Sequence, residues 1–217
     1  MPPENIGAFI RANTEIVAPQ LVPEIRLHLA TQITPIWHAT EAQLETQGLP
    51  PPFWAFCWPG GQALARYLLD NPDIISGRRV LEFAAGGAVS GIAAAMAGAA
   101  SVTANDIDGF ALTAAGFNAK LNDVELEISA DDLVRFGGAD DFDVILAGDI
   151  FYEQTPAIDI EGFLRREAAR GALVLVGDPG RKYLPRDGLT AMARYDVPTT
   201  LEIEDQKIRE GIVWRVD

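Results

Sequence analysis

VLEFAAGGAVSGIAAAMAGAASVTANDID (Val80–Asp108) decides the fold of this chain. It opens on an apolar run, passes through a turn of small residues into an Ala-rich helix, and returns to a second apolar run. This order of strand, turn, helix and strand forms a right-handed crossover between parallel strands. Small residues in the turn let the backbone approach a ligand closely. The stretch therefore predicts half of a nucleotide-type cofactor site.

Two acidic residues flank the turn and bear on which cofactor it binds. Glu82 stands at the end of the first predicted strand and Asp106 at the end of the second. An acid about 20 residues after a Gly-rich turn also occurs in dinucleotide folds, so an oxidoreductase stays open. An acid directly before the turn is instead the order found in S-adenosylmethionine-dependent methyltransferases. Glu82 suits the cofactor's amino group and Asp106 the ribose hydroxyls, although helix capping by Asp106 or Asp108 is a structural alternative.

Helices and strands alternate along the rest of the chain. The patterns predict helices near 62–69, 89–97, 110–121 and 158–170, and strands over 79–83, 101–105, 125–129, 143–147 and 172–176. Two further β-rich runs, 196–204 and 211–216, have no long helix between them and predict an antiparallel pair at one sheet edge. We expect an α/β fold, a Rossmann-like seven-stranded doubly wound sheet that is mostly parallel with an antiparallel C-terminal strand.

The first sixty residues are expected to form a helical and loop extension packed on residues 61–217, the cofactor-binding part of one structural domain. Apolar spacing over Ile6–Val17 predicts a helix, and alternation over Ile25–Leu29 predicts a strand. Thr40–Thr46 could add a helical turn. The Pro-rich segment Leu49–Gly61 should lack regular structure and fold its aromatic side chains onto the body.

Composition excludes several classes of function. A net charge of −14 argues against binding a phosphate backbone and fits a basic protein partner better, although acidity also serves solubility. Cys57 is the single cysteine, and His28 and His38 lack a ligand pattern, so neither a disulfide nor a metal site is expected. The N-terminus lacks the features of a signal or transit peptide, and no apolar run approaches a membrane span. We expect a cytoplasmic protein.

Five motifs resemble those of the seven-β-strand protein-lysine methyltransferases. They are WPGGQ (Trp58–Gln62), VLEFAAGGA (Val80–Ala88), TANDID (Thr103–Asp108), LAGDIFYE (Leu146–Glu153) and VGDPGR (Val176–Arg181). The resemblance runs from about Pro23 to Trp214, and the combination is specific where each fragment alone is not. It implies a class I methyltransferase with S-adenosylmethionine as cofactor. It also implies a lysine amine as methyl acceptor, with the β subunit of electron transfer flavoprotein as the expected substrate.

The resemblance also implies a set of cofactor-binding residues: Trp58, Glu82, Ala84, Gly86, Asp106, Ile107, Asp132 and Leu133. Ile107 would pack against the adenine. Asp132, with Asp131 as its rival, would bond the adenine amino group while Leu133 covers the ring. Trp58 would lie beside the sulfonium, where a cation–π contact contributes about 0.5–2 kcal/mol, or would anchor the Pro-rich loop. Gln62 is a weaker candidate.

The turn departs from the family pattern at two positions. Ala84 and Ala88 stand where the family usually has the first and third of three glycines, with Gly86 between them. Alanine takes ordinary φ and ψ values but cannot cheaply take φ > 0. We expect the turn to bind the cofactor with altered affinity. A cofactor-binding module with weakened catalysis is the alternative function.

The segment DIFYE (Asp149–Glu153) follows a predicted strand at the rim where ligands bind. DNA amino methyltransferases have Asn/Asp-Pro-Pro-aromatic here to stack a base, so the missing prolines favour a lysine amine. We expect Asp149 to hold the amine or pass its proton to water, and Tyr152 to form an aromatic wall. Asp178 and Arg181 are expected substrate contacts. Another protein or a small-molecule amine remains open as the acceptor.

Overall fold

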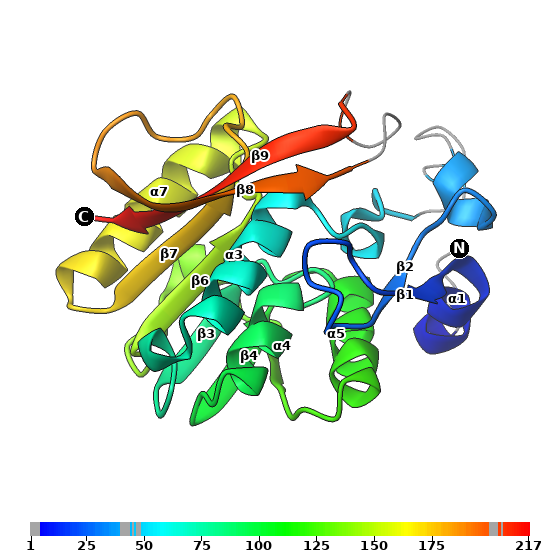
Figure 1. Ribbon diagram of the computed structural model, residues 1–217, viewed down its shortest axis with the longest axis horizontal. Coiled ribbons are helices and arrows are strands. Elements are labelled where there is room, and N and C mark those ends of the chain that lie inside the picture. The colour runs from blue at the N-terminus through cyan, green and yellow to red at the C-terminus, as the bar shows by residue number, and fades with distance from the viewer. Residues whose placement is uncertain (1–4, 40–43, 45, 47–48, 200–203, 205) are drawn as a thin grey trace.

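A seven-stranded sheet forms the centre of the protein. The computed structural model describes residues 5–217 except 40–43, 45, 47–48, 200–203 and 205 (Figure 1). The strands lie in the order β5-β4-β3-β6-β7-β9-β8. They are β3 (Arg79–Phe83), β4 (Ser101–Asn105), β5 (Glu127–Ser129), β6 (Val144–Gly148), β7 (Leu173–Asp178), β8 (Leu189–Pro198) and β9 (Ile208–Val216). The pairs from β5 to β7 are parallel, and β9 runs antiparallel to both of its neighbours, which confirms the predicted fold class.

The strand order reverses between β3 and β6. From β3 the chain moves outward through α4 (Val89–Met96), β4 and α5 (Gly109–Leu121) to β5. It then returns to the other side of β3 and builds β6, α7 (Gln154–Ala169) and β7. In open α/β sheets, ligands bind beyond the carboxyl ends of the strands at such a reversal. The ends of β3 and β6 therefore mark the centre of the site.

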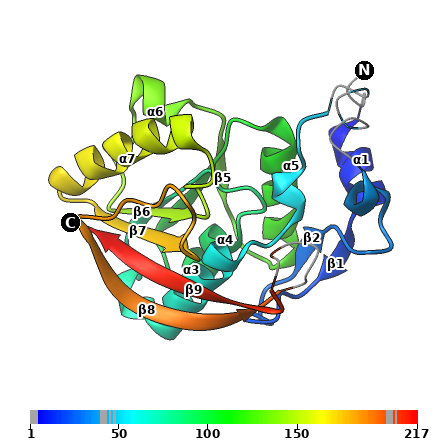
Figure 2. The same ribbon diagram turned by 90° about the horizontal axis from the view of Figure 1, so that it is seen from above.

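Helices cover both faces of the sheet. Figure 2 shows α3 (Pro59–Asp70) and α4 on one side of the central strands, with α6 (Leu133–Phe136) and α7 on the other. Alternate strand residues enter two apolar cores: Val80 and Val144 pack with α3 and α4, whereas Leu81 and Ile145 pack with α7. Burial on both faces explains why these strands read as continuous apolar runs.

The N-terminal segment packs beside α5 (Figure 1). It comprises α1 (Ile6–Asn13), β1 (Glu15–Val17), β2 (Leu27–Leu29) and two 3₁₀ turns, Pro35–His38 and Phe53–Ala55. The predicted helix over Ile6–Val17 is wrong beyond Asn13, because the Thr14 hydroxyl donates to the carbonyl of Ile10 and the backbone turns extended. The β-branched pair that follows joins an antiparallel ladder with β2. The turn predicted over Thr40–Thr46 falls mostly outside the described residues.

Three other boundaries differ from the predicted ones. Helix α3 begins at Pro59 rather than Gln62, because proline fits the first helical position, where its missing N–H has no partner to lose. Helix α7 begins at Gln154, one turn before the predicted Ile158. Strand β8 spans Leu189–Pro198 rather than 196–204, because this strand is mostly exposed and carries little apolar alternation. No helix in the described part of the chain is long and apolar enough to cross a membrane.

Candidate active site

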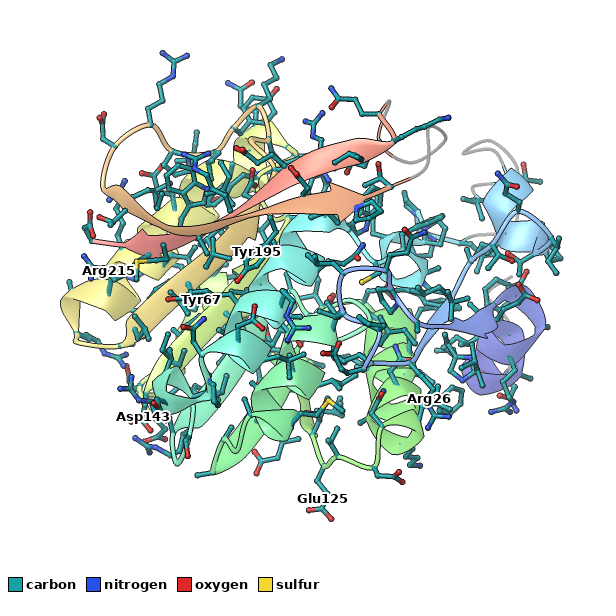
Figure 3. All side chains as sticks on the ribbon, in the orientation of Figure 1. Arg26, Tyr67, Glu125, Asp143, Tyr195 and Arg215 are labelled. Atoms are coloured by element: carbon teal, nitrogen blue, oxygen red, sulfur yellow. The ribbon has the colours of Figure 1, made fainter. Side chains whose placement is uncertain are left out.

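Four neighbouring strands carry a carboxylate at the same rim of the sheet. Asp106 follows β4, Glu82 lies near the end of β3, Asp149 follows β6, and Asp178 ends β7. Because these strands are parallel, their carboxyl ends meet at one edge. Asp143, labelled in Figure 3, precedes β6 and marks the opposite edge. The candidate site lies at the rim with the four acids.

The carboxyl group of Glu82 is buried between β3 and the first turn of α4. The backbone N–H of Ser90 donates to Glu82 Oε1 at 3.0 Å, while Oε2 has no hydrogen-bond partner among the described residues. Burial raises the pKa of Glu82 to about 8, although the hydrogen bond from the Ser90 N–H favours the anion. Buried polar atoms normally have a partner, so Oε2 is suited to accept from a ligand.

The turn between β3 and α4 has the left-handed backbone that glycine favours. Ala84 has φ 52°, Gly86 has φ 51° and Ala88 has φ 61°. Both alanines therefore adopt the left-handed conformation rather than the ordinary negative φ expected for alanine. This conformation costs about 1–2 kcal/mol per alanine. The N–H of Gly86 donates to Asp106 Oδ2 at 2.9 Å, which ties the turn to the end of β4. The turn keeps a glycine-like shape in spite of its alanines.

The residues expected around adenine lie beyond β4 and β5. The side chain of Ile107 is 80% exposed, so its apolar surface is available to a ring. Leu133 is buried in the core beneath α7, and Asp132 accepts from the N–H of Arg135 as the cap of α6. Asp131 instead accepts from the hydroxyl of Ser129. A role for Asp132 and Leu133 at adenine stays a prediction.

These groups fit S-adenosylmethionine. Buried Gln62 donates through Nε2 to the carbonyl of Cys57, and its Oε1, like Glu82 Oε2, has no partner among the described residues. Two such acceptors suit the cofactor's amino group, and Asp106 and Ile107 suit its ribose and adenine. Within the described part of the chain, no three His, Cys, Asp or Glu side chains gather where a metal ion could bind.

Asp149 lies at the end of β6 and is held from two sides. Its carboxylate is buried, with Oδ2 accepting from the N–H of Gly61 and Oδ1 from Nη2 of Arg181, both at 2.9 Å. Burial raises the pKa of Asp149 to about 7, and Asp178 adds to the rise while Arg181 opposes it. Its φ of 56° is strained for a side chain with a Cβ, a feature that gathers at functional sites.

Three aromatic side chains, from the turn after β6 and the loop before α3, contact one another. Tyr152 is 49% exposed, and its ring lies 5.3 Å from that of Phe53. The Phe53 ring lies 6.4 Å from that of Trp58, whose Nε1 donates to the Phe53 carbonyl at 3.0 Å. Trp58 is therefore half-buried and fixed in the loop, as both of its predicted roles require. Sequence reasoning did not single out Phe53 as a site residue.

Comparisons with known proteins place the chain in a family. The model of the family PrmA, ribosomal protein L11 methyltransferase, matches residues 63–153. The electron transfer flavoprotein beta subunit lysine methyltransferase of Danio rerio is 40% identical over 98% of this chain and 83% of its own length. The Xenopus laevis protein of that name is 38% identical over 95% of this chain and 85% of its own length. The chain belongs to this lysine methyltransferase family.

A solved structure supports the fold of this family member. The magnesium protoporphyrin IX methyltransferase of Synechocystis PCC 6803, solved with bound SAH, superposes with a TM-score of 0.51 at 16% identity. The match covers 70% of this chain and 79% of that one. At this identity the likeness concerns the fold alone, and it agrees with the class I methyltransferase sheet described above.

The methyltransferase motifs meet at one close backbone contact that sequence reasoning missed. A Cβ on Gly60 would lie 2.2 Å from the carbonyl oxygen of Gly177 and 2.6 Å from Asp149 Oδ2. A Cβ on Gly148 would lie 3.0 Å from Cα of Gly61. Glycine in WPGGQ, AGD and VGD therefore lets the N-terminus of α3 touch the ends of β6 and β7. The signal was present, because each of the three motifs carries glycine beside its site residue.

Asn118 also supports the methyltransferase site and was not predicted. It is fully buried in α5, where Nδ2 donates to the carbonyl of Gly87 at 2.9 Å and Oδ1 accepts from the N–H of His28 at 2.7 Å. It therefore links the cofactor turn to β2. Nothing in the sequence marked it except a polar residue within an apolar helix.

Proposed function

We propose that this protein transfers a methyl group from S-adenosylmethionine to a lysine amine of the electron transfer flavoprotein β subunit. The observation that carries the proposal is the buried carboxylate of Asp149, held by Gly61 and Arg181 at the point where the strand order reverses. Family membership supports the choice of substrate, since the relatives bear that name.

The cofactor would be held by groups from the ends of β3 and β4 and from the helices α3 and α4. Glu82 Oε2 and Gln62 Oε1 would accept from the amino group, and the N-terminus of α4 would favour the carboxylate. Asp106 would accept from the ribose hydroxyls, and Ile107 would cover the adenine. S-adenosylmethionine, when bound, supplies a methyl group on a sulfonium that is already activated for transfer.

Asp149 and the aromatic side chains would prepare the lysine amine. Lysine has a pKa of about 10.4 in water, so it arrives protonated and must lose a proton before it can attack. Asp149 would accept a hydrogen bond from the nitrogen and receive the proton or pass it to water, a task suited to a pKa of about 7. Tyr152 and Trp58 would exclude water and fix the side chain. Such positioning can lower the barrier by about 7–11 kcal/mol.

Two further features of the partner and compartment remain expectations. The net charge of −14 suits a lysine-bearing, basic segment of the substrate protein. A cytoplasmic location stays a prediction.

The test combines methyl transfer with peptide mapping. Purified protein is incubated with radiolabelled S-adenosylmethionine and recombinant electron transfer flavoprotein, and the labelled peptides are sequenced. We expect label on lysine of the β subunit. Label on a different protein from a lysate, or on a small-molecule amine alone, would contradict the substrate assignment.

A cofactor-binding module with weakened catalysis is the second candidate, and the strained alanines of the turn are the observation that favours it. A thermal shift assay separates it from the first, because a ligand that binds only the folded state raises its stability. The module predicts a raised Tm with S-adenosylhomocysteine and no labelled lysine. An active enzyme predicts a raised Tm and a labelled lysine.

A further inference from the structure

Arg181 joins two buried carboxylates at the rim of the sheet. Its Nη2 lies 2.9 Å from Asp149 Oδ1 and 2.5 Å from Glu204 Oε1, and its Nη1 lies 3.3 Å from Glu204 Oε2. The arginine side chain is 19% exposed, and those of Asp149 and Glu204 are 6% and 4% exposed. The guanidinium therefore binds Glu204 through both terminal nitrogens and Asp149 through Nη2 alone.

Arg181 is fixed by its backbone and by an aromatic face as well. Its N–H donates to Asp178 Oδ1 at 2.6 Å, in the turn that follows β7. Its Cζ lies 5.5 Å from the centre of the Trp58 ring, a cation–π arrangement. Nε of Arg209 lies 3.8 Å from Glu204 Oε2, which helps to hold the acid that orients the arginine. The guanidinium is thus fixed on several sides before any substrate arrives.

The charges that face Asp149 come from several elements. Asp178, on β7, disfavours the anion, and Arg181, in the following turn, favours it. Burial raises the pKa of the Cys57 thiol, next to α3, so this group stays neutral and adds no charge at neutral pH. Glu204, in the segment between β8 and β9, shares the positive charge of Arg181 with Asp149 and also lies 3.8 Å from Nε of Arg209. Among the described side chains facing Asp149, the guanidinium is the cation that favours its charged form.

We infer that Arg181, oriented by Glu204, is a positioning residue that favours the ionised form of the Asp149 carboxylate and holds it in one orientation for the substrate amine. The inference rests on the proposed function, in which Asp149 receives the lysine. Without the guanidinium, Asp149 would lie buried beside Asp178 with only the Gly61 N–H to stabilise its charge, and it would take a proton instead. A protonated Asp149 could no longer accept the proton of the lysine.

The experiment compares Arg181→Met, Arg181→Lys and Glu204→Gln with Arg194→Met. Arg194 pairs with Glu210 on the exposed face of the β8–β9 hairpin, far more open to solvent than Arg181, and serves as the matched control. For each variant, kcat and KM for the β subunit are measured from pH 6 to pH 9, together with Kd for S-adenosylhomocysteine and Tm. The Asp149 carboxyl is also titrated by ¹³C NMR without substrate.

We expect Arg181→Met to lower kcat about five- to tenfold at neutral pH and to move the rising limb of its pH profile upward by about one pH unit. The NMR titration should move in the same direction, while KM and the S-adenosylhomocysteine Kd change little. Arg181→Lys should restore most of the pH midpoint but not all of kcat, since it keeps the charge and loses the fork. Glu204→Gln should give a kcat and a pH midpoint between those of Arg181→Met and the wild type. Arg194→Met should match the wild type.

Three results would overturn the inference. A lowered Tm with an unmoved pH midpoint would make Arg181 a merely structural residue. A raised kcat in Arg181→Met would mean that the guanidinium obstructs the substrate. If the NMR titration of Asp149 is the same in Arg181→Met and the wild type, Arg181 does not affect the ionisation of Asp149. This result counts even if the wild type methylates nothing. By contrast, an inactive wild type whose Asp149 titration does depend on Arg181 would count against the proposed function and leave the positioning role standing.

Discussion

The two ends of the central sheet carry carboxylates in opposite environments. At the carboxyl ends, Glu82 and Asp149 are buried, and burial raises the pKa of each. At the amino ends, Asp143 pairs with Arg79 through Oδ1 at 3.1 Å, and the two side chains are 42% and 51% exposed. There the hydrogen bond from Arg79 lowers the pKa of Asp143.

The difference separates buried carboxylates, which are costly to charge, from carboxylates that face water. Burying a carboxylate costs several kcal/mol unless it is paired, so such groups persist where a function needs them. Exposed ion pairs are screened by solvent and contribute little. The strained φ of Asp149 and of the two turn alanines lies at the same rim as the buried acids. The carboxyl end therefore concentrates features that folding alone would not favour.

The largest expected effect comes from neutralising one carboxylate at each end. Asp149→Asn should lower kcat by about 10²–10⁴-fold, because the amine loses its acceptor, while S-adenosylhomocysteine still binds. Asp143→Asn, the control at the amino end, should leave kcat unchanged. Methyl transfer is measured with saturating cofactor, and binding by calorimetry. Normal turnover of Asp149→Asn would remove Asp149 from the chemistry.

A second test breaks the backbone contact at the carboxyl end. Gly60→Ala should lower the free energy of unfolding by about 1–3 kcal/mol and reduce kcat as well, since the added methyl would collide with the Gly177 carbonyl and Asp149. Gly116→Ala, in α5, has open space around its Cβ and should be neutral or stabilising by up to about 1 kcal/mol. Urea unfolding measures both. Equal stability of the two variants would show that the close contact can relax.

The sheet could be predicted because its central strands have clear local sequence patterns. Val80 and Val144 stand in continuous apolar runs bounded by turns, so the order of elements followed from local patterns. Strand β8 was misplaced because its exposed face carries no such pattern. Local sequence also could not show that residues after Asn13 pair with β2, since their partners lie ten to fourteen positions away.

The candidate site could be predicted only in part. Glu82 lies near the end of its strand, and Asp106 and Asp149 directly follow theirs, so parallel topology alone brought them to one rim. The link from Arg181 to Glu204 spans 23 residues and depends on how the β8–β9 hairpin returns to the sheet. The role of Asn118 could not be predicted either, because its two hydrogen-bond partners come from separate elements. Contacts set by tertiary packing leave little trace in a single sequence.

A third prediction uses pH to compare the two ends without any ligand. Raised pKa values mean that folded Glu82 and Asp149 bind protons more tightly than the unfolded chain does. The free energy of unfolding should therefore fall as pH rises from about 5 to about 8, by up to about 1.4 kcal/mol per pH unit for each group. Glu82→Gln should flatten this slope in urea unfolding curves. Asp143→Asn should not, because the lowered pKa of Asp143 places its effect in acid; an unchanged slope in Glu82→Gln would contradict the assignment.

The smallest expected effect concerns the strained turn at the carboxyl end. Ala84→Gly and Ala88→Gly should each raise the free energy of unfolding by roughly 1 kcal/mol, because glycine adopts the left-handed backbone without the Cβ clash. Ala85→Gly, in the same turn but without a positive φ, should lower it by about 0.5–1 kcal/mol. Since the turn already has a glycine-like shape, Kd for S-adenosylhomocysteine should change less than about threefold in the double variant. Opposite signs within one turn would show that strain is confined to its two left-handed alanines, whereas destabilisation by all three glycines would show that the alanine methyl groups stabilise the turn through packing.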